Sequence, residues 1–176
     1  VEVQAAGSDV WSLAKVKQQL MPGSQVKTQA GSSCTVGFTD GTKLRLGPNA
    51  TFKLEEASGS KVAVFIGLGR LELWVKKLAG RSFQARNPVS VASVRGTSLV
   101  LDVISPTNVT IDVFQGSVDV TDNFGRTTPI AEGQRLEANA TTGASAPAPI
   151  PASVVAPVEP VISMPVVVAP APAAAP

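Results

Sequence analysis

Residues 40–46 read Asp-Gly-Thr-Lys-Leu-Arg-Leu, and residues 95–101 read Arg-Gly-Thr-Ser-Leu-Val-Leu. In both stretches a Gly-Thr step comes before a run with apolar residues at alternate positions. A turn followed by such alternation is typical of a β-strand with one buried face. The sequence therefore predicts structural turns at Gly41-Thr42 and Gly96-Thr97, each leading into a strand.

The sequence that follows each Gly-Thr step is also repeated. Residues 64–69 lead into the strand pattern of residues 70–73, and residues 113–116, which end on Gly116, lead into that of residues 117–120. A unit of about fifty residues thus occurs twice, which indicates a scaffold built by repetition. We predict an all-β fold, a two-layer jelly-roll-like or solenoid-like sandwich made from two related halves.

Turn-forming residues recur about every eight to twelve residues up to residue 142, as in sandwiches and barrels. Glu132-Gly133 is the last of these turns, and Gly133 is a further predicted structural turn residue. At most one short helix is expected, over residues 9–20, where Pro22-Gly23 would end it. The same residues could instead form two short strands around a loop.

The composition changes sharply at residue 143. Ala, Pro and Val dominate from there to residue 176, and Glu159 is the one charged residue in that stretch. Proline at this density favours an extended polyproline II spacer. The sequence predicts a folded domain over residues 1–142 and a disordered tail or linker over residues 143–176.

Several classes of chemistry are disfavoured by residues that the chain lacks. It contains no histidine, which removes the usual general base near neutral pH and most zinc sites. Its one cysteine, Cys34, alternates with Val36 and Phe38, so we expect a buried and inert thiol. We predict that the protein is not an enzyme and needs no metal or cofactor.

Nucleic acid is not expected as a partner, and no transmembrane segment is expected in this chain. The net charge is +2, there is no tyrosine, and the basic residues form three small clusters rather than one stripe. No apolar stretch is free enough of proline and charge to form a transmembrane helix. The basic clusters, which we expect on solvated edges and turns, are Lys15 with Lys17, Lys76 with Lys77, and Arg81 with Arg86.

Five short motifs follow one another along the chain, at residues 21–28, 36–46, 89–97, 114–120 and 132–134. In this order they resemble the FecR-like domain family of bacterial envelope proteins. The most distinctive is an apolar strand that ends in Val-Arg-Gly-Thr at residues 94–97. Ser24 and Gln115 depart from the family pattern, which often has acidic residues there.

The resemblance implies a location and a kind of function. The best-known members of the family are membrane-spanning regulators that carry an outer-membrane signal to a sigma factor. This chain shows no segment like their cytoplasmic part, so the resemblance covers the extracytoplasmic module. We therefore expect a periplasmic or secreted interaction or sensor module, which binds an envelope protein through an exposed sheet surface or edge.

Two other functions remain open at this point. A jelly-roll face could bind envelope glycan through aromatic platforms, for which Trp11 and Trp74 are the tryptophan candidates. The family resemblance also implies self-cleavage between Gly96 and Thr97, with the Thr97 hydroxyl as nucleophile. The second Gly-Thr step at residues 41–42 favours a structural role for both steps instead.

Overall fold

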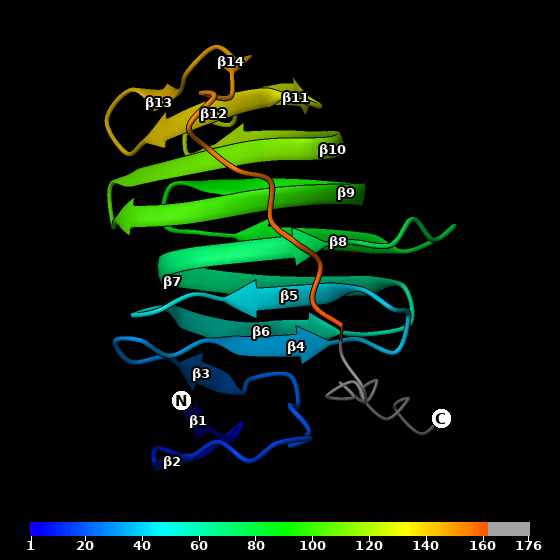
Figure 1. Ribbon diagram of the computed structural model, residues 1–176, viewed down its shortest axis with the longest axis vertical. Helices are drawn as coiled ribbons and strands as arrows, with labels where there is room; N and C mark the ends of the chain where they lie inside the picture. The colour runs from blue at the N-terminus through cyan, green and yellow to red at the C-terminus, as the bar shows by residue number, and fades with distance from the viewer. Residues whose placement is uncertain (162–176) are drawn as a thin grey trace.

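The computed structural model describes residues 1–161, and all regular structure in that part of the chain is β-strand, which confirms the all-β prediction (Figure 1). No helix that could cross a membrane occurs in residues 1–161. The strands are β1 (Glu2–Gln4), β2 (Trp11–Leu13), β3 (Gln25–Lys27), β4 (Cys34–Gly37), β5 (Lys43–Leu46), β6 (Thr51–Ala57), β7 (Lys61–Trp74), β8 (Ser82–Arg86), β9 (Ser90–Ser105), β10 (Asn108–Asp122), β11 (Thr127–Ala131), β12 (Gln134–Asn139), β13 (Gly143–Ala144) and β14 (Ala148–Pro149).

Hydrogen bonds join these strands into one mixed sheet, which folds back on itself into two layers, one behind the other, with the strands stacked along the long axis (Figure 1). The front layer, which faces the viewer of Figure 1, contains β4, β5, the second halves of β7 and β9, the first half of β10, and β12. The back layer contains β2, β1, β3, β6, the first half of β7, β8, the first half of β9, the second half of β10, and β11. Two layers are thus present as expected, but one continuous sheet supplies both.

The long strands β9 and β10 pass from one layer to the other at glycines. Gly96 has a φ of 57° and Gly116 a φ of 85°, and this left-handed conformation suits glycine because it has no Cβ. The two bends lie at the same level, where the β9–β10 register shifts around Gln115. The structure thus differs from the predicted turn at Gly96-Thr97, because the chain bends there without leaving the sheet.

The core lies between the two layers and is built from alternate residues of the facing strands. Leu44, Leu73 and Leu99 follow one another across β5, β7 and β9, and all three are fully buried. Cys34 is half-buried against this core. Burial raises the pKa of its thiol, which keeps it in the unreactive neutral form.

The structure has no helix at residues 9–20. Trp11–Leu13 forms β2, which pairs with β1, so the strand-forming alternative describes this segment better. The side chains of Val10 and Val16 are 71% and 94% exposed. A helix here would have had no core to pack against, and amphipathic helices gain most of their stability from such packing. Backbone pairing with β1 is therefore the stronger interaction.

Regular structure continues past residue 142, where the sequence predicts that the tail begins. Both β13 and β14 pair with β12. The backbone N–H of Ala144 donates to Asp122 Oδ2 at 3.0 Å, and Arg126 Nη2 donates to the carbonyl of Thr142 at 2.9 Å. Hydrogen bonds from the N–H groups of Ala144, Arg126 and Phe124 lower the pKa of Asp122 to about 2. Residues 150–161 of the predicted tail are also described by the structure, and its last part, residues 162–176, lies outside the described residues.

Candidate functional site

The structure brings the two Gly-Thr steps together on either side of the segment that follows β7. Val75 and Thr97 exchange two backbone hydrogen bonds of 2.9 and 3.1 Å. The N–H of Lys76 donates to Thr42 Oγ1 at 3.1 Å. We call this assembly the Gly-Thr junction, and it comprises Gly41, Thr42, Val75, Lys76, Lys77, Gly96 and Thr97.

The first Gly-Thr step is the turn between β4 and β5. The Gly41 N–H donates to the carbonyl of Phe38 at 3.0 Å. Both carboxylate oxygens of Asp40 stabilise the turn. Oδ1 accepts a hydrogen bond from the Thr42 N–H at 2.7 Å, and Oδ2 lies 3.2 Å from Arg81 Nη1. This turn is therefore tied to the start of β8 by an ion pair that is largely buried.

The second Gly-Thr step is the bend inside β9. The Thr97 side chain is buried, and its Oγ1 lies 2.9 Å from the carbonyl oxygens of both Arg95 and Ser117. A Cβ at Gly116 would lie 2.8 Å from the carbonyl oxygen of Gly96, and a Cβ at Gly96 would lie 2.6 Å from Lys77 Cβ. The backbone here is packed too closely for any side chain at either glycine.

An open groove runs over the outside of the junction, beside the loop that joins β7 to β8. Its volume is about 460 Å³. A second groove of about 330 Å³ continues from it across the back layer, shares Ser82 and Arg95 with it, and reaches Asp119. We call the first one the β7–β8 groove, and the side chains that define it are Lys77, Leu78, Arg81, Ser82 and Arg95.

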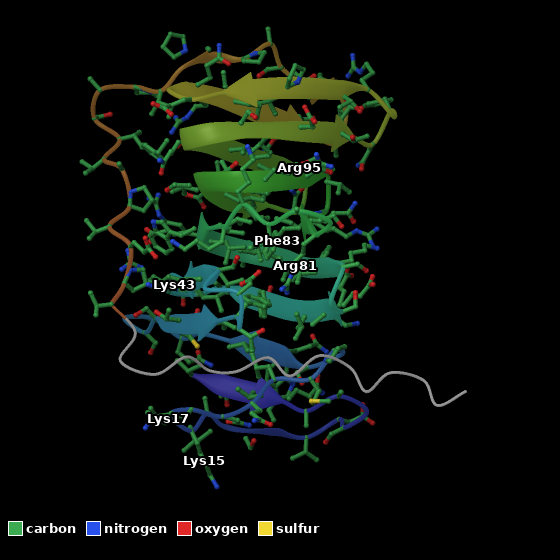
Figure 2. The ribbon with its side chains drawn as sticks, turned by 90° about the vertical axis from the view of Figure 1, so that its right-hand side faces the viewer. Lys15, Lys17, Lys43, Arg81, Phe83 and Arg95 are labelled. Carbon is green, nitrogen blue, oxygen red and sulfur yellow. The ribbon has the colours of Figure 1, made fainter. Side chains whose placement is uncertain are left out.

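The two grooves differ in the charge of their side chains. Asp119 lies in the second groove, whereas Lys77, Arg81 and Arg95 line the β7–β8 groove. Arg81 is paired with Asp40, whereas Lys77 and Arg95 have no carboxylate within 4.0 Å among residues 1–161. Phe83 lies buried beneath the grooves and meets Phe38 edge to face, with ring centroids 6.0 Å apart. The β7–β8 groove is therefore a positively charged surface above a buried aromatic pair, and Figure 2 shows Arg81, Phe83 and Arg95 near one another.

Not all of the predicted basic clusters contribute to this groove. Lys15 and Lys17 lie at the lower end of the stack of strands, whereas Arg81 and Arg95 lie nearer its middle, as Figure 2 shows. Arg86 pairs instead with Glu55 on β6, at 3.3 Å. Lys77 and Arg81 are thus the members of the three clusters that line the groove, and Arg95 joins them.

The predicted aromatic and turn residues fall in separate places. Trp11 lies on β2 of the back layer, with Lys27 Nζ 4.4 Å from its ring centroid. Trp74 lies on β7 in the front layer and is 7% exposed. The two tryptophans therefore share no groove that could bind a glycan.

The predicted turn residue Gly133 lies in the turn between β11 and β12, where its N–H donates to the carbonyl of Val113.

Sequence reasoning did not identify the β7–β8 groove. Its loop carries a visible signal, since Lys76-Lys77-Leu78-Ala79-Gly80-Arg81 is a basic segment with a glycine and lies between two strand patterns. Nothing in the spacing, however, indicates that Arg95 lies beside this loop. That proximity comes from the pairing of Val75 with Thr97, which no local pattern reveals.

The chemistry available at the groove is non-covalent. Its polar groups are hydroxyls, an ammonium group and two guanidinium groups, which donate hydrogen bonds and attract anions. Among residues 1–161, no group of three or more Cys, Asp or Glu side chains is arranged to hold a metal ion. The arrangement is suited to binding a carboxylate-bearing segment of another molecule.

Comparison with known proteins gives one family match and a related fold. The family model described as FecR protein matches residues 24–119, more than half of the chain. Two crystal structures, at 1.65 and 2.50 Å resolution, of a protein described as a "putative anti-sigma factor from Parabacteroides distasonis ATCC 8503" each superpose with a TM-score of 0.60 at 20% identity. The match covers 68% of this chain and 56% of that one. No curated protein sequence matches.

Proposed function

The chain belongs to the FecR family, and we propose on that basis that it is a non-enzymatic sensor or interaction module of the bacterial cell envelope. It works in the periplasm or outside the cell and binds a protein partner through an exposed surface of its sheet. The residues that match the family include both Gly-Thr steps and the whole β7–β8 groove. The surface with the clearest binding chemistry is therefore part of the family domain.

The observation that carries this proposal is the pair of cations, Lys77 and Arg95, which have no carboxylate within 4.0 Å in residues 1–161 and lie on a rigid support. An acidic segment of a partner would gain charge-assisted hydrogen bonds to these two groups. Because the Gly-Thr junction already holds the groove in place, binding would require little further ordering of the protein. Leu78, which is 44% exposed, offers an apolar contact at the rim.

Photo-crosslinking tests this assignment. A photo-reactive amino acid at position 78 should capture an envelope protein, whereas the same group at position 13, where Leu13 is 79% exposed at the far end of the stack, should not. The captured protein is then purified and titrated against the full chain. Charge reversal with Lys77→Glu and Arg95→Glu should weaken binding at least tenfold, since charged pairs of this kind contribute about 1.5–3 kcal/mol.

The matched control reverses the same charge elsewhere. Lys15→Glu with Lys17→Glu changes the net charge of the chain equally but lies at the lower end of the stack, away from the groove near its middle (Figure 2). This control should leave the affinity unchanged within a factor of about two, the scatter expected for a change outside the contact. Equal weakening by both pairs would show that only the net charge matters, and the groove assignment would fail.

The geometry at Thr97 favours a structural role over self-cleavage. Its hydroxyl is buried and lies between two carbonyl acceptors, that of Arg95 on β9 and that of Ser117 on β10. Mass spectrometry of the purified protein should therefore find one intact chain. Two fragments divided after Gly96 would contradict the non-enzymatic assignment.

A further inference from the structure

Two apolar side chains on the outer face of the front layer are buried although they point away from the core. Trp74 and Val100 are 7% and 1% exposed. Their chain neighbours Leu73 and Leu99 belong to the core cluster, and successive strand residues face opposite ways, so Trp74 and Val100 face outward. Groups outside the core therefore cover this face, and one of them is Arg45, whose Cζ lies 5.6 Å from the centroid of the Trp74 ring.

Charged residues flank Val100 across the front layer. Glu72 on one side accepts a hydrogen bond from Arg45 Nε at 2.7 Å. Asp112 on the other side accepts two hydrogen bonds from Arg135, at 2.6 and 2.7 Å, and these raise the pKa of the guanidinium. The face therefore has an apolar centre between paired charges.

The segment that crosses this face is the Pro-rich part of the chain. Residues 150–161 leave β14 and run down the front layer toward β5, as both views show (Figures 1 and 2). Lys43, which lies opposite Trp74 in the β5–β7 register, holds the far end. Its Nζ lies 2.9 Å from Glu159 Oε1 and donates to the carbonyl of Pro160 at 3.0 Å.

The exposure of this segment repeats every three residues. Val154, Pro157 and Pro160 are half-buried, whereas Val155 and Val158 between them are each 77% exposed. Three residues per turn is the period of a polyproline II helix. At ~3.1 Å per residue, six steps from Val154 to Pro160 cover ~19 Å. Four strand spacings of ~4.8 Å, from β12 to β5, cover the same distance.

We propose that the outer face of the front layer is a recognition surface for an extended, proline-rich segment carrying one carboxylate, and that residues 150–161 of the same chain occupy it as a strap. Aromatic-lined surfaces bind polyproline II segments in this way because such segments are already extended and lose little entropy on binding. Trp74 supplies the aromatic surface, and Lys43 recognises the carboxylate of Glu159. This surface is separate from the β7–β8 groove, so it adds to the proposed function and does not depend on it.

The strap is held loosely enough to be displaced. Its last backbone hydrogen bond to the sheet joins the Ile150 N–H to the carbonyl of Gly133, at 2.9 Å. From Val154 to Val161 the polar contacts to the sheet and its loops are those to Lys43 and a 3.7 Å approach of Lys76 Nζ to Glu159. A second segment with the same spacing of proline, valine and carboxylate can therefore compete for the face.

Tryptophan fluorescence of the full chain tests the strap. Trp11→Phe leaves Trp74 as the one indole, and acrylamide quenching then reports whether that ring is covered. In this background, Val154→Asp with Pro157→Asp should raise the quenching constant several-fold, because both residues face the sheet. The matched control, Val155→Asp with Val158→Asp, puts the same charges on the exposed side of the strap and should leave quenching unchanged.

A milder pair of variants tests the ionic contact at the end of the strap. Glu159→Gln should raise Trp74 quenching, whereas Glu56→Gln should not, although Glu56 forms an ion pair of the same 2.9 Å length with Lys61 on the back layer. A synthetic peptide of residues 150–161, added to the Val154/Pro157 variant, should restore protection. The same peptide with Gln at position 159 should restore it less well.

Two results would overturn the proposal. Equal quenching of Trp74 in the sheet-facing and solvent-facing variants would show that the strap does not cover the ring. Protection that falls on dilution, together with a dimer in size-exclusion chromatography, would assign the covering segment to a second copy of the chain and not to the same one. Far-UV circular dichroism confirms that each variant keeps its β-structure.

Discussion

The two Gly-Thr steps have the same local sequence but different structural roles. Gly41 lies in the turn that ends β4 and begins β5, whereas Gly96 lies inside β9, which continues on both sides of it. What the two steps share is the threonine, because Thr42 and Thr97 are both buried and both fasten the backbone just after β7. The comparison shows that a Gly-Thr step specifies a change of direction and an anchor, while the neighbouring strands decide whether the strand ends there.

The space around each glycine explains the difference. A Cβ at Gly41 would meet only the flexible side chain of Lys76, at 3.6 Å. At the β9 bend, Gly96 and Gly116 lie against backbone and against the base of Lys77. The bend can form only because β9 and β10 approach each other at glycines, which have no side chains. Replacing one glycine at a time by alanine tests this requirement.

The largest effect is expected from Gly116→Ala. Its φ is 85°, and the new Cβ would lie 2.8 Å from the carbonyl oxygen of Gly96, which belongs to the backbone and cannot rotate away. Left-handed strain of about 1–2 kcal/mol and overpacking of about 1–3 kcal/mol together predict a loss of ~3 kcal/mol in the free energy of unfolding. Urea denaturation measures this loss.

Gly133→Ala is the matched control for that variant. Gly133 has nearly the same φ, 80°, but no atom lies within 4 Å of its added Cβ. Only the backbone strain applies, so the expected loss is about 1–2 kcal/mol. If Gly116→Ala cost no more than Gly133→Ala, close packing at the β9–β10 bend would not be the reason for glycine there.

A smaller effect is expected from Thr97→Val. The change keeps the shape of the side chain but removes the hydroxyl that lies 2.9 Å from the carbonyl oxygens of Arg95 and Ser117. A buried acceptor left without its donor costs about 1–3 kcal/mol, so we expect a loss of ~2 kcal/mol. Thr97→Ser keeps the hydroxyl and should recover most of the stability. A serine variant as unstable as the valine variant would show that the methyl group, not the hydrogen bond, is what matters.

The sequence predicted the position of both steps but could not separate a turn from a bend. Each is a glycine followed by a threonine and an alternating strand, and each glycine has a positive φ. Whether the strand continues depends on β10 bending at the same level through Gly116, which is a contact between residues twenty apart. Local periodicity, which identifies strands well, carries no information on that contact.

Sequence reasoning predicted neither the strap nor the groove, for related reasons. In residues 150–161 most residues are apolar or proline, so the three-residue spacing of the sheet-facing side is invisible until the sheet is in place. The composition did indicate an extended chain, but not the surface on which it lies. The groove needs Arg95 beside Lys77, and that proximity is set by strand register across β7 and β9.

Gly41→Ala tests the other Gly-Thr step, at the turn between β4 and β5. Its φ of 84° imposes the same backbone strain as at Gly116, but the nearest atom to the new Cβ is Lys76 Cγ at 3.6 Å, an ordinary contact. We expect a loss of about 1–2 kcal/mol, from strain alone. Thermal or urea unfolding should place it level with Gly133→Ala. A loss as large as that of Gly116→Ala would mean that the hairpin turn is as tightly packed as the bend.

The smallest effect is expected from Thr42→Val. Thr42 is buried, but its Oγ1 accepts a hydrogen bond from the N–H of Lys76, which is an exposed residue, so the hydrogen bond itself is only partly buried. Water can reach the freed N–H, because the Lys76 side chain beside it is exposed, so the expected loss is about 0.5–1 kcal/mol. Amide hydrogen exchange gives a local readout, since exchange at Lys76 should speed up while that at Val75, which is held by Thr97, should not. If both amides exchanged faster together, the two Gly-Thr steps would act as one unit rather than as two anchors on the same segment.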